Sequence, residues 1–289
     1  MVRNRTRKIA RVLAVAGAVV VASSLGLANA WAIYGGKTAD EPYPFMTSVQ
    51  FKSDKGLLHW CGGSVIDPLW VVTAKHCMGE YPPADIGDFR PAEPSDLAIR
   101  VGSRDRTSGG ELVDVVKIVV HGKPLPTDPT EGGDGFGTDI ALLKLSRPVQ
   151  VEPVSLAAAP PNPQASPTVR LLGWGYNCKR PRHDQTCGEL PTLLRQLDTT
   201  VLPASGCVSN DPNNSNITER EICQAPTAKG ENTRAHDSGS PMLQKVNQRW
   251  TLVGLLSRPH VQSQTVDGPS IYTDATAYAS WIRQQIDAP

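Results

Sequence analysis

The chain has 289 residues, of which 39% are hydrophobic, 29 are basic and 28 are acidic, so it can bury one large core or two smaller ones. This composition excludes a disordered or collagen-like protein. Residues 1–32 hold five basic side chains and no acidic one, which leaves 24 basic and 28 acidic side chains in the remainder, a net charge of −4. A mildly acidic surface has no electrostatic basis for binding nucleic acid or anionic lipid, so neither is expected as a partner.

The first 32 residues have the features of a secretory signal peptide. A basic start precedes an apolar stretch, residues 12–27, that is short for a membrane span. Small side chains then permit cleavage after Ala30 or after Ala32, and the second cut leaves Ile33 as the new N-terminus. An uncleaved membrane anchor is the alternative interpretation. We expect residues 1–32 to be removed and the remaining chain to be secreted, without attachment to a membrane.

All six cysteines follow this segment, and an even number of cysteines in an exported chain favours a disulfide framework. Six cysteines permit 15 pairings. Pairing in sequential order closes three short loops, through Cys61 with Cys77, Cys178 with Cys187, and Cys207 with Cys223. Neither CxxC nor HExxH spacing occurs, so we expect no metal site and no cofactor.

Short aliphatic and β-branched segments alternate with turn-forming residues, which is typical of β-barrels and β-sandwiches. Residues 81–96 and 122–138 are predicted to be polar loops, and residues 157–168, with four prolines, are predicted to be a linker. Strands are predicted at residues 64–66, 70–73, 112–120, 140–145, 169–172 and 251–256.

One segment has helical spacing, residues 275–286, where Tyr278, Trp281 and Ile282 fall on one face. The pattern as a whole predicts two β domains, residues 33–160 and residues 161–289, with the helix at the end of the second.

Three segments combine reactive residue types with suitable neighbours, in the order His, Asp, Ser. His76 precedes Cys77 at the end of an apolar strand, where a disulfide would hold its ring in place. Asp139 begins a strand too apolar to supply another charge, and a buried carboxylate needs a partner. Ser238 lies on a bend of small residues, where its hydroxyl can protrude and its backbone N–H can face a carbonyl oxygen.

This trio suits nucleophilic catalysis, because a serine hydroxyl is too weak an acid to attack an amide unaided at neutral pH. A histidine can accept the hydroxyl proton and return it to the leaving amine. The aspartate holds the imidazole in the required tautomer and stabilises the imidazolium. The order His76, Asp139, Ser238 differs from the order in subtilisin and in the α/β-hydrolases.

The sequence resembles the chymotrypsin-like (trypsin-like) serine proteases over nearly all of the chain after residue 32. Each matching motif is weak alone, but the ordered set is specific. The motifs are Ile33-Tyr34-Gly35-Gly36, Cys61-Gly62-Gly63-Ser64, Thr73-Ala74-Lys75-His76-Cys77, Asp139-Ile140-Ala141-Leu142, Gly173-Trp174-Gly175, Asp237-Ser238-Gly239 and Ile271-Tyr272-Thr273.

The resemblance implies an all-β fold of two six-stranded antiparallel barrels with a C-terminal α-helix and a site between the barrels. It implies that Ser238 is the nucleophile and that the N–H groups of His236 and Ser238 form the oxyanion hole. It also implies that a free amine on Ile33 pairs with Asp237.

The sequence departs from the family pattern around the predicted substrate pocket. His236 stands where glycine is usual, Asn232 where trypsin-like members have an aspartate, and Arg234 where a cysteine braces the pocket wall. We therefore expect no strong preference for Lys or Arg before the cleaved bond. The expected pocket residues are Asn232, Ser257, Arg258, Pro259 and Ser270, of which Arg258 and Pro259 replace an aromatic residue and a glycine.

The sequence supports a secreted, monomeric serine endopeptidase that hydrolyses peptides or proteins through an acyl-enzyme. The alternative is a catalytically weak or inactive relative that binds a protein partner, and the side chain at His236 and the missing N–H of Pro259 favour it. His59 lies beside Trp60 in a predicted strand, and we interpret it as a hydrogen-bonded structural residue.

Overall fold

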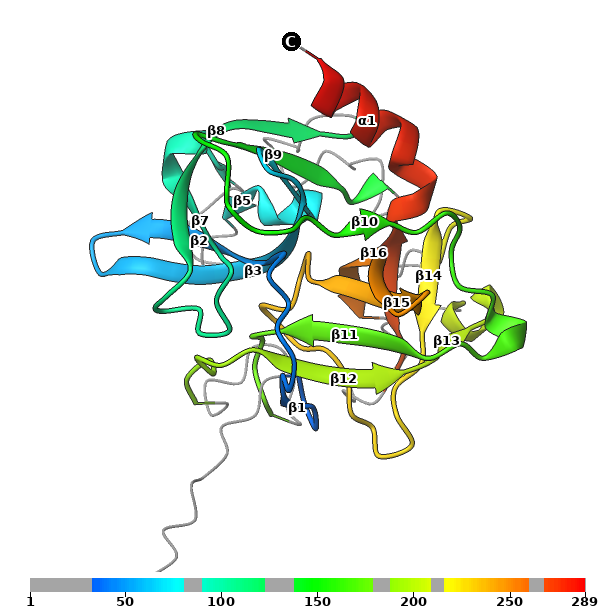
Figure 1. The fold of residues 1–289 in the computed structure, drawn as a ribbon. Helices are drawn as coiled ribbons and strands as arrows, with labels where there is room; N and C mark the ends of the chain where they lie inside the picture. The colour runs from blue at the N-terminus through cyan, green and yellow to red at the C-terminus, as the bar shows by residue number, and fades with distance from the viewer. Residues whose placement is uncertain are drawn as a thin grey trace, which may run out of the picture.

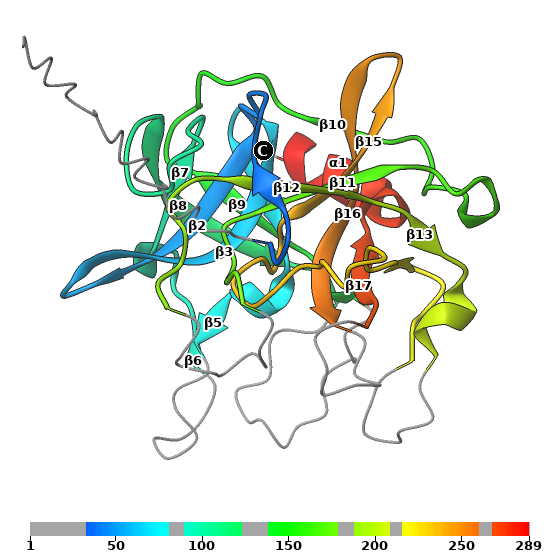
Figure 2. The same ribbon diagram turned by 90° about the horizontal axis from the view of Figure 1, so that it is seen from below.

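The computed structural model describes residues 33–80, 90–122, 138–178, 188–208, 216–259 and 268–288. Two β lobes stand side by side, and one α-helix follows the last strand (Figures 1 and 2).

The first lobe is a closed barrel of six antiparallel strands in the order β2-β3-β4-β9-β8-β7. Aliphatic side chains such as Val71, Ile99 and Leu142 are fully buried inside it. The strands are β2 (Met46–Ser53), β3 (Gly56–Asp67), β4 (Trp70–Thr73), β7 (Leu97–Val101), β8 (Glu111–Val120) and β9 (Ala141–Leu145).

The second lobe is a sheet in the order β1-β12-β11-β15-β16-β17-β14-β13, with β10 pairing in parallel with β16. Strand β13 at one end of this order and β12, next to β1 at the other end, are separated in the chain by Thr200 alone, so the sheet curls back on itself. The strands are β1 (Lys37–Thr38), β10 (Ser155–Leu156), β11 (Val169–Gly173), β12 (Arg195–Thr199), β13 (Val201–Leu202), β14 (Glu221–Gln224), β15 (Pro241–Val246), β16 (Arg249–Pro259) and β17 (Ser270–Asp274).

Short elements complete the described chain. Asp274 caps the first turn of the C-terminal helical segment by accepting a 2.8 Å hydrogen bond from the N–H of Thr276. The elements are β5 (Gly79–Glu80), β6 (Arg90–Pro91), the 3-10 helices η1 (Lys75–Cys77), η2 (Pro94–Asp96), η4 (Pro163–Ala165), η6 (Ala204–Cys207) and η7 (Ala275–Tyr278), and the helix α1 (Ala279–Asp287).

The predicted all-β class with a C-terminal helix is confirmed, and each predicted strand lies within or overlaps an observed one. The second sheet has nine strands where six were expected. Strand β1 is added beside β12, β10 pairs with β16, and β12 and β13 are separated by a single residue. The domain limits stay a prediction, and the structure adds that β1 pairs with β12 of the second lobe.

Two of the three predicted disulfides are confirmed. Cys61 and Cys77 join β3 to η1 with an S–S distance of 2.02 Å, and Cys207 and Cys223 join η6 to β14 with an S–S distance of 2.05 Å. The third predicted pair includes Cys187, which lies outside the described residues.

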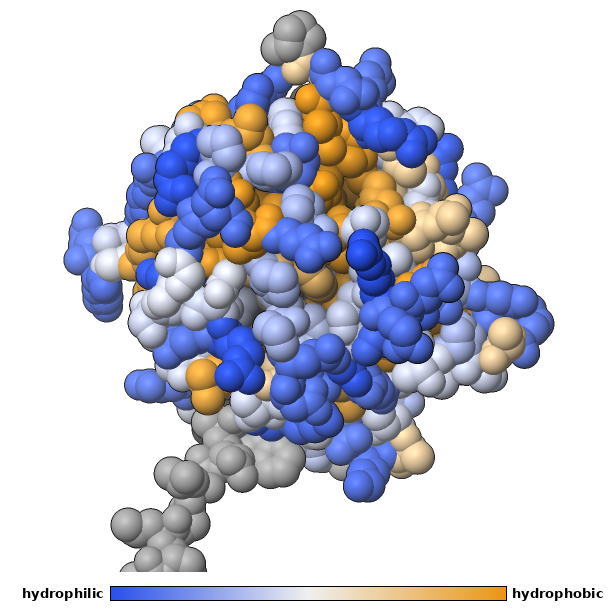
Figure 3. Space-filling model, viewed as in Figure 1, coloured by the Kyte–Doolittle hydropathy of each residue, from blue (hydrophilic) through white to orange (hydrophobic). Residues whose placement is uncertain are grey.

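The surface mixes polar and apolar residues. Figure 3 shows hydrophilic residues over much of one face, with hydrophobic residues gathered over the first barrel and beside α1. Within the described residues, no helix is both long enough and apolar enough to cross a membrane. The most exposed large apolar side chains are scattered over several elements: Leu58, Leu112, Val116, Leu193, Val208 and Val246.

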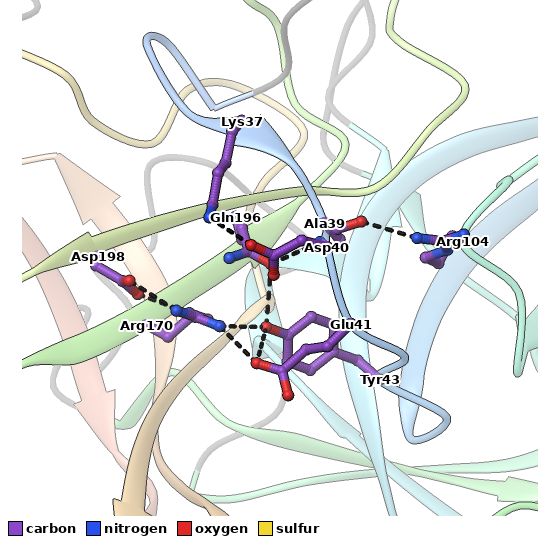
Figure 4. A network of polar contacts seen from close by, with 9 residues as sticks. All are labelled: Lys37, Ala39, Asp40, Glu41, Tyr43, Arg104, Arg170, Gln196 and Asp198. Atoms are coloured by element: carbon purple, nitrogen blue, oxygen red, sulfur yellow. Dashed lines mark hydrogen bonds and ion pairs between the residues drawn. The ribbon is translucent and has the colours of Figure 1, made fainter.

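A polar network holds the segment before β2 against the second lobe (Figure 4). The guanidinium of Arg170 on β11 donates two 2.6 Å hydrogen bonds to Asp198 on β12. It also donates to Glu41 at 2.7 Å and to the hydroxyl of Tyr43 at 2.8 Å, and lies 4.7 Å from the ring of Trp250. One side chain therefore connects the segment before β2 to two strands of the second sheet.

We expect Arg170→Met to lower the free energy of unfolding by about 2–3 kcal/mol, because it leaves several charged or partly buried acceptors without their donor. Urea unfolding measures the change. Lys37→Met is the matched control: Lys37 and its partner Asp40 are both more than half exposed, so the loss should be within about 0.5 kcal/mol. Equal effects of the two substitutions would contradict this account of the network.

Candidate functional site

His76 and Asp139 come together because their elements are neighbours in the first barrel. His76 lies on η1 directly after β4, Asp139 lies just before β9, and these two strands pair. The Nδ1 atom of His76 lies 2.8 Å from Oδ2 of Asp139, and the backbone N–H of His76 donates to Oδ1 at 2.9 Å. A carboxylate oxygen accepts, so Nδ1 carries the proton and Nε2 is left as a proton acceptor.

Asp139 is a buried carboxylate that keeps its charge. Burial alone acts to raise its pKa, but the facing His76 and the hydroxyl of Ser257 outweigh burial and hold the pKa below the usual value. Ser257 Oγ donates to Oδ2 of Asp139 at 2.6 Å from β16 of the second lobe. Groups from both lobes therefore stabilise one carboxylate.

Ser238 lies on the turn before β15, and this turn packs closely on the first barrel. The carbonyl of Ser238 accepts a 2.8 Å hydrogen bond from the N–H of Gly62 on β3. A Cβ on Gly239 would lie 2.9 Å from the nitrogen of Ala74, which leaves no room for a side chain. The serine turn is thus placed against the segment that carries His76.

Ser238 is partly exposed, and none of the described residues forms a hydrogen bond with its hydroxyl. The proton-transfer contact between Ser238 and His76 therefore stays a prediction.

The backbone N–H groups around Ser238 divide into two sets. Those of Asp237, Gly239 and Ser240 donate to carbonyls at 3.0, 2.8 and 3.0 Å. Those of His236 and Ser238 have no hydrogen-bond partner in the described part of the chain. Backbone N–H groups in folded proteins are nearly always paired, so two neighbouring N–H groups without a protein partner are unusual. Both can donate to an oxygen atom of a ligand. They are the two groups predicted to form the oxyanion hole.

Asp237 is a second buried carboxylate, fully enclosed beneath this turn. It accepts hydrogen bonds from the N–H of Gly175 at 2.6 Å and of Arg234 at 2.9 Å. No ion pair with it occurs among the described residues, and burial raises its pKa to about 7 despite these donors. Ile33, its predicted partner, is fully buried, but its nitrogen is an uncharged amide in the full-length chain.

Asn232 and Ser270, two of the predicted pocket residues, contact each other. Asn232 is 2% exposed, its Nδ2 donates to the carbonyl of Gly268 at 2.7 Å, and its Oδ1 accepts from Ser270 Oγ at 3.2 Å and from the N–H of Thr233 at 2.8 Å. The amide is neutral, and it donates one hydrogen bond and accepts two within the protein. It offers no charge to a basic ligand.

Ser257, Arg258 and Pro259 end β16, where Pro259 pairs with Ser270 of β17. The guanidinium of Arg258 is buried and forms an ion pair with Glu221 of β14, whose side chain is fully buried. The charge of Arg258 is therefore compensated inside the protein.

Two features of this region are not evident from the sequence. Ser257 is predicted only as a pocket residue, but its hydroxyl contacts Asp139, which only the family match at Ser257 could have indicated. Arg234 replaces a cysteine of the family pattern, and its contacts are new: it donates to the carbonyl of Cys178 at 3.1 Å and lies 4.9 Å from the ring of Tyr34.

His76 also lies beside a disulfide, since its ring and the sulfurs of Cys61 and Cys77 are within 4.8 Å of one another. Metal-binding cysteines are thiolates, and these two sulfurs are joined in a disulfide. The cluster therefore does not supply thiolate ligands.

A closed β-barrel, a second curled β-sheet and one C-terminal helix define the fold of trypsin-like serine proteases. A family model described as Trypsin matches residues 33–282. The chain is also similar to a trypsin of Sarcophaga bullata, with 30% identity over 257 residues, which are 87% of this chain and 87% of that protein. The chain belongs to the trypsin family.

The raised pKa of Asp237 predicts how stability depends on pH while residues 1–32 are attached. Between about pH 4, where a carboxyl group ionises in the unfolded chain, and about pH 7, the folded chain retains a proton that the unfolded chain has lost. This group therefore makes stability fall as the pH rises, by an amount on the order of a few kcal/mol.

Urea unfolding of the full-length chain and of Asp237→Asn at pH 5 and pH 7.5 isolates this contribution. We expect Asp237→Asn to gain relative stability at pH 7.5. A chain that begins at Ile33 should lack the effect, because its charged amine would pair with the carboxylate. A difference between full-length chain and variant that does not change with pH would refute the assignment.

Proposed function

We propose that this trypsin-family chain is a secreted serine endopeptidase that cleaves peptide bonds through an acyl-enzyme on Ser238. Trypsin-family proteases act on peptides or proteins, which sets the class of substrate. The observation that carries the proposal is the contact between His76 Nδ1 and buried Asp139, which leaves Nε2 free to accept a proton next to the serine turn.

The proposed reaction begins when His76 Nε2 takes the proton of the Ser238 hydroxyl and the serine oxygen attacks the substrate carbonyl carbon. The N–H groups of His236 and Ser238 receive the negative carbonyl oxygen. His76 then donates its proton to the leaving amine. A water molecule, deprotonated by His76, then attacks the carbonyl carbon of the acyl-enzyme ester. The bond to the Ser238 oxygen breaks, and His76 returns the proton to that oxygen.

Secretion is part of the proposal. Two disulfides in the described chain are consistent with an oxidising compartment. The family match begins at residue 33, directly after the possible cleavage at Ala32. A new amine on Ile33 would supply a charged partner for the buried carboxylate of Asp237, so removal of residues 1–32 would stabilise the turn that carries Ser238. Edman sequencing that finds Trp31 at the N-terminus of the exported protein would contradict cleavage after Ala32.

A fluorophosphonate probe tests the activated hydroxyl. We expect covalent labelling of the processed protein at Ser238, as mapped by mass spectrometry, and none in Ser238→Ala. His76→Ala should slow labelling by more than about 10³-fold, because the hydroxyl loses its base. Ser240→Ala is the matched control, since Ser240 lies two residues from Ser238 but is only 1% exposed. This variant should still be labelled at Ser238. A folded, processed protein that does not label would instead be the inactive, partner-binding relative.

Peptides that differ only in the residue before the cleaved bond test the pocket. We expect kcat/KM for Arg and Lys to lie within about tenfold of that for a neutral residue of similar length, because Asn232 offers no negative charge and its amide is already hydrogen-bonded. Strong selectivity for Arg would show that another group supplies the charge.

A further inference from the structure

His236 occupies a backbone conformation that side chains rarely adopt. Its φ angle is +71°, in the left-handed region that favours glycine. Only four other described residues with a side chain have a positive φ: Ile33, Ser166, Asn247 and Gln248. A histidine held here needs contacts that offset the cost of this conformation.

The imidazole of His236 supplies such contacts. Its Nδ1 lies 3.1 Å from the carbonyl oxygen of Trp60 on β3 of the first barrel. Its ring packs edge to face on Trp60 at 5.7 Å and on Tyr176 at 5.2 Å between centroids. A carbonyl only accepts, so the proton of the neutral ring is on Nδ1. Burial lowers the pKa of His236, which favours the neutral ring at neutral pH.

The two peptide groups that flank His236 are also held. The N–H of Tyr176 donates to the carbonyl of Ala235 at 3.1 Å, and this carbonyl shares a rigid plane with the N–H of His236. In a trans peptide the two groups point in opposite directions, so this contact fixes the direction of the His236 N–H.

The following carbonyl, of His236 itself, lies 3.1 Å from Nε2 of His59. Nε2 must then carry the proton, and Nδ1 of His59 accepts from the hydroxyl of Ser48 at 2.7 Å. Burial lowers the pKa of His59 to about 3, so this ring stays neutral. Both peptides of residue 236 are therefore anchored to surrounding residues, while the His236 N–H has no partner among those described.

We propose that His236 is a positioning residue for the oxyanion hole. Its ring, docked on Trp60 and Tyr176, holds the left-handed backbone in the conformation that leaves the His236 N–H open to the substrate oxygen. This inference rests on the proposed function. It reverses the simple expectation that a side chain in place of glycine impairs the site, because here the side chain stabilises the conformation that glycine would only permit.

Two substitutions distinguish the effect of the His236 ring contacts from the ability of residue 236 to adopt a positive φ angle. His236→Gly permits the same φ angle but removes the ring, and we expect kcat to fall at least about tenfold with little change in KM, because an oxyanion donor acts mainly in the transition state. His236→Asn tolerates positive φ and places an N–H donor the same number of bonds from Cα as Nδ1, so it should recover much of the loss. A general loss of stability would not produce this order.

Gln248→Gly is the matched control, because Gln248 has a φ angle of +65° in the hairpin between β15 and β16, away from the serine turn. Its kcat should equal that of the unaltered protein. Thermal melting of all variants separates folding defects from defects in the site.

A readout independent of activity is the tautomer of His236 in Ser238→Ala, observed by ¹⁵N NMR. We expect a neutral ring protonated on Nδ1. A ring protonated on Nε2, or His236→Gly with an unchanged or higher kcat, would overturn the inference while leaving the proposed function intact. An unaltered protein that neither labels with the probe nor cleaves peptides would overturn the proposed function, and the inference with it.

Discussion

The buried carboxylate of Asp139 is the group on which the arrangement of the site depends. A charge out of contact with water must be matched by donors, and Asp139 receives them from the ring and backbone of His76 and from the hydroxyl of Ser257. These donors come from η1 in the first lobe and from β16 in the second. Compensation of one charge therefore requires both lobes, and it fixes the tautomer of the histidine at the same time.

Asp237, which directly precedes Ser238, contrasts with Asp139. It is as deeply buried, but its hydrogen-bond donors are backbone N–H groups, and burial outweighs these donors and the charge of Arg234, so its pKa is raised where that of Asp139 is lowered. Two carboxylates of the same type thus differ because their surroundings differ. Ile33, the predicted partner of Asp237, is buried in the same lobe, and the cleavage that we propose after Ala32 would give it a charged amine.

The departures from the family pattern are accompanied by new contacts. Arg234, in the place of a cysteine, donates to two carbonyls and lies over the ring of Tyr34. Arg258, in the place of an aromatic residue, is neutralised by Glu221. His236, in the place of glycine, docks its ring between the two lobes. Each of the three altered side chains therefore has hydrogen-bond, ion-pair or ring contacts within the protein.

The sequence by itself determined the β class, the terminal helix, two disulfides and the pairing of His76 with Asp139 that its motifs suggested, because these follow from local apolar patterns, short cysteine spacings and distinctive motifs. It did not reveal strands such as β2, β12 and β14, because these strands bury polar side chains. Such residues can be buried only when partners distant in the chain satisfy them, as when Gln50 donates to the carbonyl of Arg106. The contacts of Ser257 and the conformation of His236 were likewise decided by the tertiary structure alone, since each depends on atoms contributed by another part of the chain.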